Sequence, residues 1–130
     1  VKEASGRFDQ ATAILTCKRA DFSALSGEDA LLLPLMSLGF EGVISVIANV
    51  LPNDYACLVK SALQGDYPTA RRIHLDRAEL CKALFEEGNP AGIKAALHAA
   101  GIIRQNTLRL PLTPVSDALY NKIIGLLKLH

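Results

Sequence analysis

The sequence lacks the features that mark membrane, nucleic-acid-binding and nucleotide-binding proteins. It has no apolar run long enough to cross a bilayer. Its acidic and basic residues are interleaved and leave a formal net charge of +1 at pH 7, with no basic run for a nucleic acid. The glycines stand singly, so no glycine-rich loop is available for a phosphate. We therefore expect no membrane, nucleic-acid or nucleotide partner.

Metal-binding patterns are also missing. The cysteines are Cys17, Cys57 and Cys81, and the histidines are His74, His98 and His130. The cysteines are far apart, and no histidine has a carboxylate or thiol at a spacing typical of a metal site. We expect no metal, and we expect the three thiols to be reduced core residues of a cytoplasmic protein.

What is present is an ordinary globular composition with an alternating pattern in its first half. Of the 130 residues, 50% are hydrophobic and 21% are charged. Strands are predicted at the start of the chain, over residues 22–25 and over residues 42–46. The last of these is β-branched and follows a glycine, which is typical of a parallel strand buried on both faces.

Helices are predicted to follow each of these strands. Asp9 is a candidate N-cap for the first, Ser26 and Asp29 resemble a capping box for the second, and Pro52 begins the third. A strand–helix repeat with short connections is typical of a doubly wound sheet or a (β/α)8 barrel. Three units cannot close a barrel. Because the chain also opens at Val1, in mid-strand by this interpretation, we expect a carboxyl-terminal portion of a longer protein.

No further strand is predicted after residue 65. Asp66 should cap a helix that has an apolar face as far as Leu84 and is broken at Gly88. A second helix should cover residues 91–100, and Ser116 should cap a last one. The solvated face of one helix is predicted to carry four acidic residues, Asp76, Glu79, Glu86 and Glu87. The sequence thus divides into an α/β part, residues 1–65, and a helical part, residues 66–130.

The candidate chemistry lies at the ends of the predicted strands. Lys2, Gly27 and Ile44 each fall at or near a carboxyl end, where parallel-sheet enzymes carry their active sites. A lysine withdrawn from water loses its proton more readily and can attack a carbonyl to form an imine. A glycine allows close approach of a ligand to the backbone. Taken alone, however, a lysine after a valine is more often a solvated surface residue.

Several motifs resemble those of one enzyme family. They are Lys2-Glu3-Ala4-Ser5-Gly6, Leu25-Ser26-Gly27-Glu28-Asp29-Ala30, Gly42-Val43-Ile44-Ser45-Val46 with Ala48-Asn49, Asn89-Pro90 with Lys94, and Leu108-Arg109-Leu110-Pro111-Leu112. The lysine motif is that of the pyruvate-dependent class I aldolase superfamily. The combination resembles the carboxyl-terminal portion of the dihydrodipicolinate synthase family over essentially the whole chain.

The resemblance implies the last three βα units of a (β/α)8 TIM barrel, strands six to eight, followed by a small helical domain. It implies that Lys2 forms an imine with pyruvate, without a cofactor. The resulting enamine then attacks L-aspartate 4-semialdehyde, in the route to diaminopimelate and lysine. Ile44 matches a position whose main chain contacts pyruvate, and Gly27 matches a substrate-side glycine. A homotetramer is implied as well.

The sequence also departs from the family pattern. Gly88 and Gly92 stand where proline is common, which should loosen a turn. The family's relay tyrosine, carboxylate-binding arginine and threonine pair precede the lysine, so the 130 residues alone should be inactive without an amino-terminal half. A related lyase acting on another keto acid and a non-catalytic homologue are the alternatives.

Overall fold

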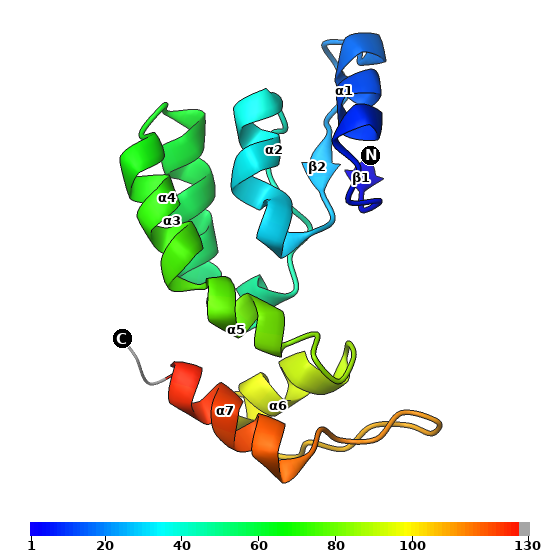
Figure 1. Cartoon of the computed structure of the whole chain (residues 1–130), viewed down its shortest axis with the longest axis vertical. Coiled ribbons are helices and arrows are strands. Elements are labelled where there is room, and N and C mark those ends of the chain that lie inside the picture. The colour runs from blue at the N-terminus through cyan, green and yellow to red at the C-terminus, as the bar shows by residue number, and fades with distance from the viewer. Residues whose placement is uncertain (128–130) are drawn as a thin grey trace.

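The computed structural model describes residues 1–127, so His130 lies outside the described residues. In order, its elements are β1 (Lys2–Glu3), α1 (Phe8–Cys17), β2 (Leu25–Ser26), η1 (Asp29–Leu31), α2 (Leu32–Leu38), η2 (Ile47–Asn49), α3 (Pro52–Leu63), α4 (Tyr67–Asp76), α5 (Ala78–Ala83), α6 (Ala91–Ala99) and α7 (Asp117–Leu127) (Figure 1). The predicted α/β class is confirmed at this level, and the chain is largely helical.

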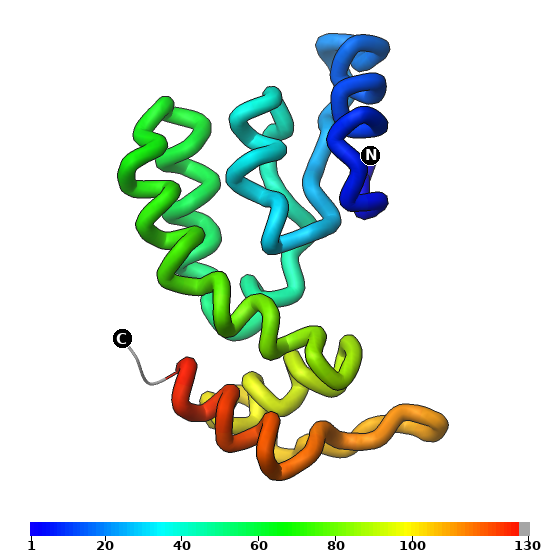
Figure 2. Tube along the Cα trace, in the orientation of Figure 1, coloured from blue at the N-terminus to red at the C-terminus, as the bar shows by residue number. Residues whose placement is uncertain are grey.

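The helices form two groups. Helices α1 to α4 run side by side, with β1 and β2 next to α1, and the α6–α7 pair lies across the far end beyond α5 (Figure 1). The connection between α6 and α7 projects as a long narrow loop (Figure 2). Among the described residues, no helix is both long enough and apolar enough to span a membrane.

The strands are shorter than the sequence pattern predicted. β1 and β2 pair in parallel, with Lys2 opposite Leu25 and Glu3 opposite Ser26. The expected strand over residues 22–25 is shifted toward Ser26, and in the expected strand over residues 42–46 only Val43 makes a bridge, to Ser26. This segment still runs parallel to β2, as predicted. Within residues 1–127 it has a pairing partner on one side only.

Two predictions about the helices were wrong. Asp9 was predicted to be the N-cap of the first helix, but α1 begins at Phe8 with Arg7 as its N-cap. Asp9 lies inside the first turn, where its carboxylate still interacts favourably with the positive end of the helix dipole. The helix expected from Asp66 to the break at Gly88 is divided at Arg77 into α4 and α5. The break accompanies a contact in which Arg77 Nε donates to Asp54 Oδ2 at 2.6 Å, so the guanidinium links this junction to α3.

The capping-box prediction was also wrong, because the Asp29 carboxylate accepts amides from the segment after residue 45 instead. Other helix signals were correct. Gly39 has the left-handed φ of 115° that ends α2. The side chain of Asp66 accepts the amide of Thr69 at 3.2 Å, and Ser116 Oγ accepts the amide of Leu119 at 3.2 Å.

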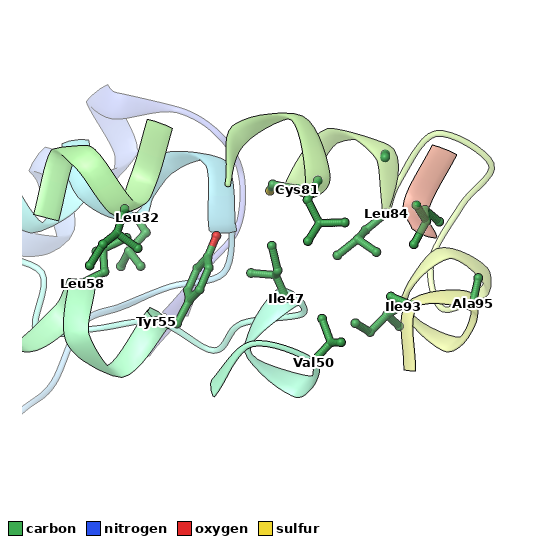
Figure 3. Packing of buried hydrophobic residues seen from close by; sticks show 14 of the residues in the cluster. Leu32, Ile47, Val50, Tyr55, Leu58, Cys81, Leu84, Ile93 and Ala95 are labelled. Carbon is green, nitrogen blue, oxygen red and sulfur yellow. The ribbon is translucent and has the colours of Figure 1, made fainter. Parts of the chain in front are cut away.

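One large hydrophobic cluster joins most of the helices. It runs from Leu32 and Leu58 through Ile47 to Ile93, and it includes buried residues on both sides of residue 65 (Figure 3). A smaller cluster fixes α1 and α2 against the residues before β2 through Ala11, Ala24, Leu35 and Phe40.

The prediction of three core thiols was wrong in part. Only Cys81 is buried, whereas Cys17 and Cys57 are exposed. Both exposed thiols lie on helices whose apolar face packs on one side, so a cysteine at the margin of that face meets water.

Candidate active site

The three strand ends predicted to carry the chemistry lie side by side. Ser26 is fully buried between the other two segments. Its amide donates to Gly42 O and its carbonyl accepts the amide of Ile44, both at 2.8 Å. On the other side, the amide of Gly27 donates to Glu3 O at 2.6 Å. The backbone therefore brings Lys2, Gly27 and Ile44 to neighbouring positions on one edge of the parallel sheet.

Gly27 lies directly against the lysine. A Cβ atom built on Gly27 would lie 2.9 Å from Lys2 Cε, 2.9 Å from Glu3 O and 2.5 Å from Ala4 Cβ. No side chain larger than hydrogen fits between these atoms. The glycine thus leaves room for the end of the lysine side chain, which is exposed and makes no ion pair within residues 1–127.

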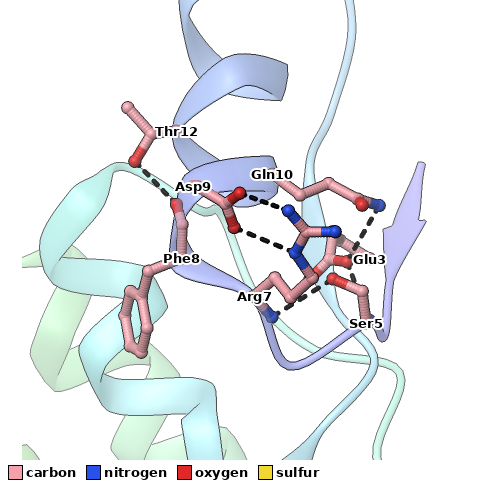
Figure 4. Close-up of polar contacts among 7 residues, drawn as sticks. All are labelled: Glu3, Ser5, Arg7, Phe8, Asp9, Gln10 and Thr12. Atoms are coloured by element: carbon pink, nitrogen blue, oxygen red, sulfur yellow. Dashed lines mark hydrogen bonds and ion pairs between the residues drawn. The ribbon is translucent and has the colours of Figure 1, made fainter.

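The residue after the lysine anchors the strand. Glu3 is buried, and its Oε1 accepts the amide of Ser5 at 2.8 Å and Nε2 of Gln10, on α1, at 3.3 Å (Figure 4). Consecutive residues of a strand point to opposite faces, so the anchoring of Glu3 turns Lys2 to the other face. The sequence motif contained Glu3, but its role was not predicted, since its partners are a loop amide and a helix residue.

Asp29 is the second residue whose role was missed. It is 3% exposed, and its Oδ2 accepts the amides of Val46 at 2.8 Å and Ile47 at 3.1 Å. Its other oxygen, Oδ1, is buried without a hydrogen-bond partner in the described part of the chain. The Ser26–Asp29 spacing was a visible signal, but it was interpreted as a helix cap.

Two buried acidic groups lie near this carboxylate. Burial, with a further contribution from the negative charge of Asp29, raises the pKa of the Tyr55 phenol above its usual range. The same two causes raise the pKa of the Cys81 thiol to about 12. Neither group is therefore ionised near neutral pH.

Other charged residues serve the helical part. Lys94 donates to the carbonyl of Thr107. Glu86 pairs with Lys122 at 2.6 Å, and Glu87 accepts the amide of Ser116 at 2.7 Å. The two glutamates are exposed, as expected of a solvated face, but they also bind α7, Glu87 just before its first residue and Glu86 near its middle.

The expectation that Gly92 loosens a turn was wrong. Gly92 is buried within α6, and a Cβ there would lie 2.0 Å from the carbonyl oxygen of Leu84. It is therefore a point of close helix packing. Gly88, which has a φ of +96°, does lie in a turn. No group of three or more histidine, cysteine, aspartate or glutamate side chains able to hold a metal occurs in residues 1–127.

These features describe an α/β protein with a free lysine at the carboxyl edge of a parallel sheet. A model of the dihydrodipicolinate synthetase family matches residues 1–130. The 4-hydroxy-tetrahydrodipicolinate synthase of Azobacteroides pseudotrichonymphae is 50% identical over 123 residues, which are 95% of this chain and 41% of the relative. The chain belongs to the dihydrodipicolinate synthetase family.

Solved structures agree with this assignment. The crystal structure of dihydrodipicolinate synthase from Aquifex aeolicus has a TM-score of 0.93 and 42% identity, covering 98% of this chain and 43% of that one. The chloride-inhibited synthase from Acinetobacter baumannii, complexed with pyruvate, has a TM-score of 0.89 and 33% identity, covering 98% and 43%. The chain thus spans about two fifths of the length of the relatives it matches.

Proposed function

We propose that this chain supplies the lysine-bearing part of an enzyme that condenses pyruvate with L-aspartate 4-semialdehyde to 4-hydroxy-tetrahydrodipicolinate. Family membership and the pyruvate carried by the Acinetobacter baumannii relative support the substrates. The observation that carries the proposal is the position of Lys2, whose Cε lies against Gly27 next to the end of the Ile44 segment.

The proposed reaction begins at Lys2. Its neutral Nζ attacks the keto carbon of pyruvate, and loss of water gives an imine. Removal of a proton from the pyruvate methyl group gives an enamine. The enamine carbon then forms a bond to the aldehyde carbon of the semialdehyde, whose oxygen takes up a proton, and the imine to Lys2 forms again. The amino group of the semialdehyde part then replaces Nζ at the imine carbon, which closes the ring and releases Lys2 as an amine. No cofactor takes part, because the imine itself withdraws the electrons that a cofactor would otherwise withdraw.

In this proposal residues 1–65 are strands six to eight of a (β/α)8 barrel, with their helices, and residues 66–130 are a helical domain. An amino-terminal half supplies the other strands and the proton-relay groups. Two features support this partner. The Val43 segment pairs only with Ser26 in the described structure, and beside it lies a groove of about 480 Å³ with apolar walls that include Leu25, Val43 and Val59.

A completed barrel tests the proposal. We define it as this chain joined to the amino-terminal segment of the Aquifex aeolicus synthase, with the junction chosen by superposition. Mass spectrometry of the products should detect condensation by the completed barrel and not by the 130-residue chain. A pyruvate imine without condensation would favour a related lyase that uses another aldehyde. Neither imine nor condensation would favour a non-catalytic homologue.

The same barrel tests the assembly. We propose a cytoplasmic homotetramer, as the resemblance to the family implies. Light scattering should give four times the mass of one completed barrel, whereas the mass of a monomer or dimer would contradict this part of the proposal.

A further inference from the structure

The segment that contains Ile44 is held at two points by residues of one turn. At the start of the segment, the amide of Ile44 donates to Ser26 O at 2.8 Å. At its end, the amides of Val46 and Ile47 donate to Asp29 Oδ2. Residues 44–47 are thus attached to residues 26–29 by a backbone link at one end and a side-chain link at the other. The two attachments together fix the direction of the peptide units between them.

The peptide unit between Ile44 and Ser45 makes no hydrogen bond within residues 1–127, so the carbonyl of Ile44 is free. It accepts no hydrogen bond from any residue in the range 1–127. It lies between the two attachment points, on the segment next to the strand end of Gly27. A free carbonyl with a fixed direction is suited to contact a small ligand bound at the neighbouring lysine.

Stability alone does not account for the carboxylate. Asp29 is almost fully buried, yet Oδ1 has no hydrogen-bond partner within the described residues. An unsatisfied polar oxygen in the interior costs free energy, and burial of a charge costs more. A residue that only filled the space near Tyr55 and Cys81 would be apolar. The two amides on Oδ2 are the feature that requires an acceptor here.

We propose that Asp29 is a positioning residue whose carboxylate orients the main chain of Ile44 toward pyruvate bound on Lys2. This inference rests on the proposed function and deepens it. Asp29 does not touch the reacting atoms in this account. It acts through the backbone of residues 44–47.

The test uses Asp29→Asn and Asp29→Ala in the completed barrel. Hydrogen bonds to a charged acceptor are about twice as strong as neutral ones, so asparagine should hold the two amides less firmly and alanine not at all. We expect the KM for pyruvate to rise about threefold in Asp29→Asn and about thirtyfold in Asp29→Ala, given the sensitivity of rate and binding to small misplacements. The KM for the semialdehyde should stay within about twofold of the unsubstituted value.

Two controls separate positioning from loss of stability. Asp54→Ala removes another partly buried carboxylate, one that binds Arg77 between helices, and it should lower the melting temperature without changing the KM for pyruvate. Val46→Pro removes one donated amide and keeps Asp29, and the φ of −84° at Val46 is compatible with proline. Val46→Ala keeps that amide and is its matched control.

Each outcome has a distinct meaning. A raised pyruvate KM in the Asp29 variants and in Val46→Pro, but not in Asp54→Ala or Val46→Ala, supports the inference. If Asp29→Ala fails to fold, Asp29→Asn and Val46→Pro decide by the same criterion. An unchanged pyruvate KM in these variants overturns the role of Asp29 alone. Failure of the unsubstituted completed barrel to trap pyruvate on Lys2 overturns the proposed function, and this inference with it.

Discussion

The Cβ position of Gly27 lies 2.9 Å from Cε of Lys2, so the end of the lysine side chain occupies space that only a glycine leaves open. Glu3 O and Ala4 Cβ close the other sides of this position. The lysine and the glycine come from adjacent parallel strands whose register is fixed by Lys2 opposite Leu25 and Glu3 opposite Ser26. The candidate site is therefore set by the pairing of two short strands.

Replacement of Gly27 should damage both the strand pair and the imine. The added methyl group must push β1 away from the turn after β2, and crowding of this kind typically costs about 1–3 kcal/mol. We expect Gly27→Ala to lower the free energy of unfolding by that amount in urea titrations. In the completed barrel, it should reduce pyruvate trapping on Lys2 by about tenfold or more. Unimpaired trapping would show that the glycine is not needed at the site.

Two helical glycines should respond in opposite directions to the same substitution. A Cβ at Gly92 meets the backbone of Leu84, whereas a Cβ at Gly125, in α7, has no contact within 4 Å. We expect Gly92→Ala to destabilise the chain by about 3 kcal/mol through overpacking. Gly125→Ala should stabilise it by about 0.5–1 kcal/mol, since glycine is a poor helix former. Chemical denaturation measures both. Equal effects would mean that α6 and Leu84 are not in close contact.

The three thiols should differ in reactivity. Burial raises the pKa of Cys81 to about 12, so its thiolate is scarce near neutral pH and its sulfur is shielded. Cys17 and Cys57 are exposed. A thiol-reactive disulfide reagent should label these two in the folded chain and Cys81 only after unfolding, as mapped by peptide mass. Labelling of Cys81 at the same rate as the other two would contradict the described core.

His74 should make stability depend on pH. Burial lowers the pKa of His74, and its Nδ1 is buried without a partner in the described structure. An unfolded histidine takes up a proton near pH 6.5, so below that pH the unfolded chain binds more protons and stability falls as the pH drops toward the folded pKa. The melting temperature should therefore be lower at about pH 5 than at about pH 7.5. The difference should shrink in His74→Gln, and an equal difference in both proteins would exclude His74 as the cause.

Much of the candidate site could be predicted because its signals are local. Lys2, Gly27 and Ile44 each lie at or near the end of a predicted strand, and the carboxyl ends of parallel strands lie on one edge. Helix starts at Asp66 and Ser116 and the stop at Gly39 were likewise encoded within one turn of chain.

What could not be predicted depends on distant partners. Asp29 lies 17 and 18 residues from the amides that it accepts, and a contact from a side chain to a backbone leaves no periodic trace in the sequence. The break at Arg77 coincides with a contact to Asp54, which is 23 residues away. The exposure of Cys17 and Cys57 depends on which side of each helix is covered. Periodicity predicts an apolar face but not its margins.

The central claim is that Lys2 forms an imine with pyruvate, and borohydride trapping tests it most directly. The completed barrel is incubated with pyruvate, reduced, digested and mapped by peptide mass, beside Lys2→Ala and Lys94→Ala variants. We predict one reduced pyruvate adduct, on the peptide that carries Lys2, in the unsubstituted and Lys94→Ala proteins, and none in Lys2→Ala. An adduct on any other lysine, or no adduct in a folded completed barrel, would contradict the account.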